Sequence, residues 1–121
     1  MTNVLILEDN PAIASVLEVI AKRLNIDYMH FITPSDAIRE DAIEKASFII
    51  TDFEMPPENA LVLLSYLKKH NIKKPVVMYS GYTGAKEEVI ENGYEDLINE
   101  YLDKPADLKQ IMNVFNKYIV K

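Results

Sequence analysis

The sequence predicts an α/β fold in which one five-stranded parallel sheet is doubly wound, with helices on both of its faces. Two observations lead to this prediction. Short aliphatic runs alternate along the chain with longer segments in which apolar residues recur at helical spacing. Several of these runs are apolar without interruption, as is typical of strands that helices cover on both sides. Five β/α repeats in succession imply parallel strands joined by right-handed crossovers.

The first two strand–helix repeats occupy the N-terminal part of the chain. Residues 4–7 are all aliphatic and predict the first strand. The helix that follows keeps apolar residues at helical spacing until Asn25, which offers a C-terminal stop. Residues 26–31 predict the second strand. The second helix is expected to start after a cap at Thr33 and to run to about Lys45.

Three further repeats complete the fold. They are predicted as a strand at 48–51, a helix from 61 to about 70, a strand at 76–79, a helix at 85–92, a strand at 101–102 and a last helix at 108–119. After the third strand, Pro56 and Pro57 forbid a helix and predict a loop. In the last helix, Val114 and Tyr118 fall off the main apolar stripe. Both are therefore expected to remain free for a partner or for a second copy of the chain.

Length and composition predict one domain, residues 1–121, in the cytoplasm. No apolar stretch approaches the roughly 18 residues needed to span a bilayer, and the N-terminus lacks a basic leader, so no membrane association is expected. The absence of cysteine excludes a disulfide framework and a thiolate metal site. A net charge of -6 argues against direct nucleic-acid binding, because phosphates need a basic face. The expected partners are proteins or small ions.

Chemically special residues follow four of the predicted strands. They are Glu8 with Asp9, then Asp52, then Ser80, and finally Lys104. Because the carboxyl ends of parallel strands meet at one edge of the sheet, and ligands of open α/β sheets bind there, we expect these side chains to form one site.

Charge indicates what such a site would bind. Two carboxylates about 4 Å apart repel by roughly 4 kcal/mol at an effective dielectric near 20, so Glu8, Asp9 and Asp52 need a cation or protons between them. Mg²⁺ prefers oxygen ligands and is the natural candidate, whereas zinc is disfavoured because no histidine stands at ligand spacing. A carboxylate beside Mg²⁺ can attack a phosphoryl group, and Asp52 is the best candidate. Lys104 and Ser80 would then contact the phosphoryl oxygens.

Taken together, these motifs resemble the receiver domain of two-component response regulators, in particular single-domain regulators of the chemotaxis type. The resemblance spans essentially the whole chain. It is carried by Glu8-Asp9, by Asp52 followed by Met55-Pro56, by Ser80-Gly81, and by Tyr101 three residues before Lys104-Pro105. It implies a flavodoxin-like fold with strand order 2-1-3-4-5.

The resemblance also implies a chemistry. Asp52 would accept a phosphoryl group from a phosphohistidine on a histidine kinase or a histidine phosphotransfer protein. Glu8, Asp9, Asp52 and the backbone carbonyl of Glu54 would hold Mg²⁺, and Lys104 would bond the phosphoryl group. The domain would catalyse its own phosphorylation and dephosphorylation, with no conventional turnover of a substrate.

The output implied by the resemblance is a shift between two conformations. Ser80 would move toward the phosphoryl group and Tyr101 would turn into the vacated space. This change would alter the face made by the helix 85–92, the strand 101–102 and the last helix, where a downstream protein or a second copy of the chain is expected to bind. The segment 91–102 departs from the family pattern by about two extra residues, so the identity of that partner is not predicted.

Two positions stand where the family tunes the lifetime of the phosphoryl group. Glu54 lies two residues after Asp52, and Tyr82 lies two residues after Ser80. We expect Glu54 to add negative charge beside the site and Tyr82 to shield it from water.

Two other classes of function remain open at this stage. The chain could be a scaffold that signals without phosphorylation, or a phosphatase with an aspartate nucleophile. The phosphatase is disfavoured because a glutamate, Glu54, and not an aspartate stands two residues after the nucleophile, and because no cap domain encloses a substrate.

Overall fold

A computed structural model describes residues 3–119 of the chain, and it contains the doubly wound α/β fold that the sequence predicts. The strands of its main sheet are β1 (Asn3–Leu7), β2 (Asp27–Phe31), β3 (Phe48–Thr51), β6 (Val76–Ser80) and β7 (Glu100–Asp103). Their order in the sheet is β2-β1-β3-β6-β7, and every neighbouring pair is parallel. With the strands renumbered along the chain, this is the predicted order 2-1-3-4-5.

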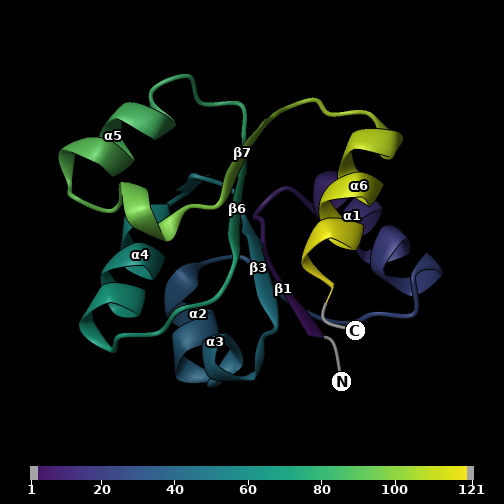
Figure 1. The fold of residues 1–121 in the computed structure, drawn as a ribbon, viewed down its shortest axis with the longest axis horizontal. Coiled ribbons are helices and arrows are strands. Elements are labelled where there is room, and N and C mark those ends of the chain that lie inside the picture. The colour runs from purple at the N-terminus through teal and green to yellow at the C-terminus, as the bar shows by residue number, and fades with distance from the viewer. Residues whose placement is uncertain (1–2, 120–121) are drawn as a thin grey trace.

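Helices cover both faces of this sheet (Figure 1). They are α1 (Pro11–Arg23), α2 (Pro34–Arg39), α3 (Ala42–Lys45), α4 (Ala60–Lys69), α5 (Ala85–Glu91) and α6 (Leu108–Tyr118). One apolar cluster joins the sheet to α1 and α6, and a second joins its other face to α2, α3, α4 and α5. The alternation of side chains along β1 explains the two clusters, since Val4 and Ile6 enter the first and Leu5 and Leu7 the second.

The parallel register aligns the carboxyl ends of the strands and so prepares the site. Leu7 pairs with Thr51 between β1 and β3, and Ser80 pairs with Asp103 between β6 and β7. The hydrogen bonding continues for one residue beyond the strands. The amide of Asp52 donates to the Leu7 carbonyl at 2.8 Å, and that of Lys104 donates to the Ser80 carbonyl at 3.1 Å.

The second helix differs from its prediction. It ends at Arg39, and a separate helix, α3, begins at Ala42 after Asp41, which has a left-handed backbone with φ of 57°. The break has a packing reason. On one continuous helix, Ala37 and Ala42 would point about 140° apart. In the broken structure both are buried in the same apolar cluster.

Two small elements were not predicted from the sequence. Around Pro56 and Pro57 the chain forms an antiparallel hairpin of β4 (Glu54–Met55) and β5 (Glu58–Asn59). Ahead of β7 it forms a short 3-10 helix, η1 (Glu95–Leu97).

The prediction that the last helix leaves two residues free is wrong. Val114 is only 3% exposed and belongs to the cluster under α1 and α6. Tyr118 packs against the same cluster, and its Oη donates a hydrogen bond to Glu100 Oε1 at 2.9 Å. Burial and this bond raise the pKa of Tyr118 to about 12. The apolar stripe of α6 is wider than the sequence suggested because β7 and α1 both pack against it.

No helix in the described part of the chain combines the length and the apolar character that a membrane span requires.

Shortening Val114 tests its place in the core. We expect Val114→Ala to lower the free energy of unfolding by about 1 to 3 kcal/mol, because it removes buried methyl groups and leaves a cavity. Val16→Ala is the matched control, since Val16 is also helical but 46% exposed. Urea unfolding measures both. Equal free-energy changes for the two variants would contradict the burial of Val114.

Candidate functional site

Three carboxylates meet at the carboxyl edge of the sheet. Glu8 and Asp9 follow β1, and Asp52 follows β3. One oxygen from each lies within 4.8 Å of the others. Glu8 is 1% and Asp52 8% exposed, whereas Asp9 is open to solvent. The sequence predicted this grouping, and the parallel register of β1 and β3 produces it.

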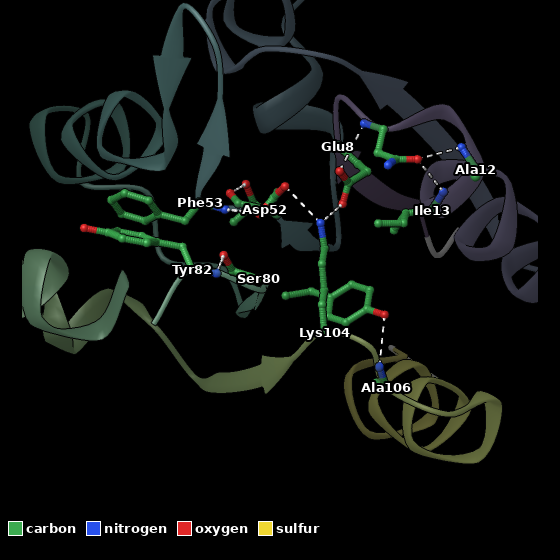
Figure 2. A network of polar contacts seen from close by, with 12 residues as sticks. Glu8, Ala12, Ile13, Asp52, Phe53, Ser80, Tyr82, Lys104 and Ala106 are labelled. Carbon is green, nitrogen blue, oxygen red and sulfur yellow. Dashed lines mark hydrogen bonds and ion pairs between the residues drawn. The ribbon is translucent and has the colours of Figure 1, made fainter. Parts of the chain in front are cut away.

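Lys104 lies between two of these carboxylates (Figure 2). Its Nζ is 2.8 Å from Glu8 Oε1 and 2.9 Å from Asp52 Oδ2. The ammonium also lies 5.5 Å from the centre of the Tyr79 ring, which β6 presents beside it. The lysine therefore neutralises part of the charge that three neighbouring carboxylates would otherwise leave uncompensated.

The pKa shifts in the cluster follow from burial and from this pairing. Burial raises the pKa of the Glu8 carboxyl, against the lowering effect of its hydrogen bond to Lys104. Burial alone would lower the pKa of Lys104, but its hydrogen bonds to Glu8 and Asp52 outweigh burial and raise it. The ammonium thus remains charged at neutral pH, while burial makes ionisation of the Glu8 carboxyl costly.

Backbone groups fix the position of Asp52. Its Oδ1 accepts a hydrogen bond from the Phe53 amide at 2.7 Å, and its own carbonyl accepts one from Thr51 Oγ1 at 2.7 Å. The Phe53 amide therefore fixes the position of Oδ1, and Lys104 fixes that of Oδ2.

The loop after β1 is held by its own side chains. The amide of Asn10 donates to Glu8 Oε2 at 3.1 Å. Asn10 in turn caps α1, because its Oδ1 accepts from the amides of Ala12 and Ile13 (Figure 2). Glu8 and Asp9 are thereby placed between a strand end and a helix start.

The donor set fits a hard divalent cation. The three clustered groups offer carboxylate oxygens only, the ligands that Mg²⁺ prefers, and no histidine or cysteine belongs to the cluster within residues 3–119. Asp9 is exposed and Asp52 lies at the surface end of its strand, so a partly hydrated ion could reach both.

Ser80 and Tyr101 line one cleft beside the cluster. This cleft has a volume of about 310 Å³ and lies between the end of β6, the start of α5 and β7. Ser80 Oγ accepts a hydrogen bond from the Tyr82 amide at 3.1 Å. The Oη of Tyr101 is buried and has no hydrogen-bond partner among the described residues. Burial, and next the charge of Glu95, raise the pKa of Tyr101.

Tyr82 lies over the residue that follows Asp52. Its ring centre is 5.3 Å from that of Phe53, and its Oη donates to Glu88 Oε2 at 2.6 Å. The ring also lies above Gly84, where an added Cβ would come within 2.6 Å of it. Glu54, by contrast, is exposed on β4.

Sequence reasoning missed the contacts that surround these residues. Phe53 and Glu88 support Tyr82, and Asn10 supports Glu8. Asn10 could have been found as a cap residue just before a helix. The pairing of Tyr82 with Glu88, six residues later, follows no repeat of strand or helix and has no sequence signal.

Comparisons with known proteins find a matching family model and several relatives. A family model described as response regulator receiver domain matches residues 4–116. The chain is 26% identical over 113 residues to transcriptional regulatory protein KdpE of Staphylococcus aureus, covering 91% of this chain and 46% of the relative. It is 22% identical to chemotaxis protein CheV1 of Helicobacter pylori, covering 93% of this chain and 37% of that protein. The chain thus spans less than half the length of these curated relatives.

Solved structures show the same fold. A CheY-like receiver domain protein from Methanospirillum hungatei matches with a TM-score of 0.81 and 18% identity, over 97% of this chain and 92% of its own. Response regulator TrrA of Thermotoga maritima, in complex with Mg²⁺-BeF, matches with a TM-score of 0.79 and 16% identity, over 98% and 99%.

Removing the ammonium group tests the charge balance of the cluster. We expect Lys104→Met to lower the free energy of unfolding at pH 7 by about 1 to 3 kcal/mol, because two buried carboxylates lose their shared partner. Combining it with Glu8→Gln should recover part of this loss, since one of the two charges is then gone. Urea unfolding of the single and double variants measures the coupling.

Lys109→Met, which removes an exposed lysine of α6, is the control. A loss no greater for Lys104→Met than for Lys109→Met would contradict the proposed balance. The loss should also shrink in mild acid, where protonation of a carboxylate relieves the repulsion.

Proposed function

The chain belongs to the response regulator receiver domain family, and from this premise we propose that it is a switch activated by phosphorylation of Asp52. One observation carries the proposal. Asp52 has two further carboxylates beside it and the ammonium of Lys104 bonded to Oδ2, at the edge of the sheet where α/β proteins bind ligands. An anionic nucleophile between a cation-binding group and a positively charged side chain suits phosphoryl transfer.

The donor in this proposal is a phosphohistidine on a histidine kinase or a histidine phosphotransfer protein, as in two-component systems. An oxygen of Asp52 attacks the phosphorus, the P–N bond breaks, and the histidine nitrogen departs with its electron pair. Lys104 is close enough to contact the transferred phosphoryl group, because its Nζ already lies 2.9 Å from Oδ2 of the attacking carboxylate. The proposed partners are therefore proteins that carry a phosphohistidine, and the net charge of -6 argues against direct contact with nucleic acids.

Mg²⁺ is the proposed cofactor. Glu8, Asp9 and Asp52 would hold it together with the backbone carbonyl of Glu54, and when bound it would neutralise charge on the carboxylates and on the phosphoryl oxygens. The oxygen-only donor set supports this assignment. The Mg²⁺-BeF complex of TrrA, a protein with the same fold, supports it as well.

The proposed output uses Ser80 and Tyr101. Ser80 Oγ accepts a bond from Tyr82 and keeps its own proton available for a phosphoryl oxygen. Tyr101 borders the same cleft and could turn into the space that Ser80 leaves. The face formed by α5, β7 and α6 would then change, and we propose it for contacts with a downstream protein or a second copy of the chain in the cytoplasm.

Glu54 and Tyr82 are proposed to set how long the phosphoryl group survives. The Tyr82 ring packs against the ring of Phe53, the residue directly after the acceptor, and the Tyr82 hydroxyl donates to Glu88. This position suits a shield against water. Glu54, exposed on the neighbouring hairpin, adds negative charge at the rim.

Phosphorylation by a small donor tests the acceptor. With Mg²⁺ and acetyl phosphate, intact mass spectrometry should detect the gain of one phosphoryl group, which Asp52→Asn should abolish and the exposed-site control Asp96→Asn should keep. Beryllium fluoride binding provides a second readout if the adduct is short-lived. Failure of both in the wild type would favour a scaffold that works without phosphorylation, and multiple turnover of phosphate esters would favour a phosphatase.

Removing the Tyr82 ring tests the shield. After the phosphodonor is removed, Tyr82→Ala should lose its phosphoryl group about 3-fold faster or more than the wild type, because water reaches the acceptor more easily. Tyr82→Phe keeps the ring but not the bond to Glu88, and so separates stacking from the hydrogen bond. An unchanged or slower decay in Tyr82→Ala would rule the shield out.

A further inference from the structure

His30 makes a contact with the acidic site that the sequence did not indicate. It lies in β2, on the face of the sheet that α1 covers, since its neighbours Met29 and Phe31 pack on the opposite face. Its Nε2 is 2.7 Å from the backbone carbonyl oxygen of Glu8. A carbonyl can only accept, so in this contact Nε2 carries the proton and donates it.

The same ring reaches the helix that starts after the site. His30 Nδ1 lies 3.5 Å from Oε2 of Glu18, which belongs to α1. The two side chains are each about one quarter exposed, at 25% and 26%. The imidazole thus connects three elements: the edge strand, the loop that carries the acidic pair, and the helix that follows the loop.

The Glu8 carbonyl, which accepts the hydrogen bond from His30, orients the peptide between the two acidic residues. The Glu8 carbonyl and the Asp9 amide belong to one planar peptide unit, so the direction of the carbonyl sets the orientation of the plane that joins the two acidic residues. The amide of Glu8 is already held, because it donates to the Phe31 carbonyl at 3.1 Å. The hydrogen bond from His30 holds the Glu8 carbonyl as well, so β2 bonds both the amide and the carbonyl of Glu8.

The orientation of Asp9 depends most on this hydrogen bond. Glu8 is packed into the protein, but Asp9 is exposed and has little packing to hold its direction. We propose that His30 is a positioning residue of the cation site, whose hydrogen bond to the Glu8 carbonyl orients the Glu8–Asp9 peptide and aims both carboxylates at a divalent cation. This inference rests on the proposed Mg²⁺ site. It follows the general rule that groups behind the ligands orient them and thereby set affinity.

Titration calorimetry with Mg²⁺ alone tests the inference. We expect His30→Phe, which keeps a ring in the strand but removes the donor, to raise the Mg²⁺ Kd about 5-fold or more. His30→Gln offers an amide donor near the same place and should restore at least half of the lost affinity. Met29→Ala is the control for general loosening of β2, because Met29 contacts the other apolar cluster. Its Kd should stay within about twofold of the wild type.

Two results with the variants would overturn the inference. One is a Kd for His30→Phe within twofold of the wild type, and the other is an equal weakening by Met29→Ala. Nitrogen NMR of the wild-type imidazole provides a test that needs no variant, since a neutral ring protonated at Nδ1 and not at Nε2 would exclude the bond to Glu8. A wild-type protein that bound no Mg²⁺ would overturn the proposed cofactor along with this inference, whereas normal binding by both wild type and His30→Phe would overturn the inference alone.

Discussion

An ammonium group held between two buried carboxylates is the interaction on which the site depends. Lys104 lies within 2.9 Å of oxygens from both Glu8 and Asp52, which are almost completely buried. The carboxylates are close because their strands are parallel and in register, and that register is set by apolar residues that must stay on their own faces. A shift by one residue would force the apolar side chains to repack on the opposite face of the sheet and would separate the charges. The constraint that builds the sheet is therefore also the constraint that builds the site.

The charged groups of the cluster differ in how firmly they are held. Glu8 is tied by Lys104 and by the Asn10 amide, and Asp52 by Lys104 and the Phe53 amide, while Asp9 is open to solvent. A divalent cation arriving from solvent would meet Asp9 first. When a cation binds, the ammonium of Lys104 is the group that can move, because it is a point charge on a flexible side chain beside the Tyr79 ring.

The sequence alone predicted the parts of this fold that depend on local residue patterns. Runs of mostly apolar residues predicted β1, β3 and β6, and the special residues at the ends of the strands predicted the edge at which Glu8, Asp52 and Lys104 meet. Features that depend on packing between distant segments were missed. The break at Asp41 follows from the need to bury Ala37 and Ala42 together, and Val114 is covered because two elements pack on α6. The contact of His30 with Glu8 joins residues 22 positions apart through the β1–β2 pairing, and no periodicity reports it.

The cleft at Ser80 and Tyr101 indicates how a small chemical change could move a larger surface. A buried hydroxyl without a partner costs about 1 to 3 kcal/mol, and the Oη of Tyr101 is such a group among the described residues. Any arrangement that gives this hydroxyl a partner would recover an energy of that size. A gap of a few kcal/mol is also what a ligand must supply to shift a two-state equilibrium. Ser80 borders the same cleft, and Lys104 follows Tyr101 on the same segment. Bonds from Ser80 and Lys104 to a phosphoryl group at Asp52 would therefore change the surroundings of Tyr101 and the relative energies of its two positions.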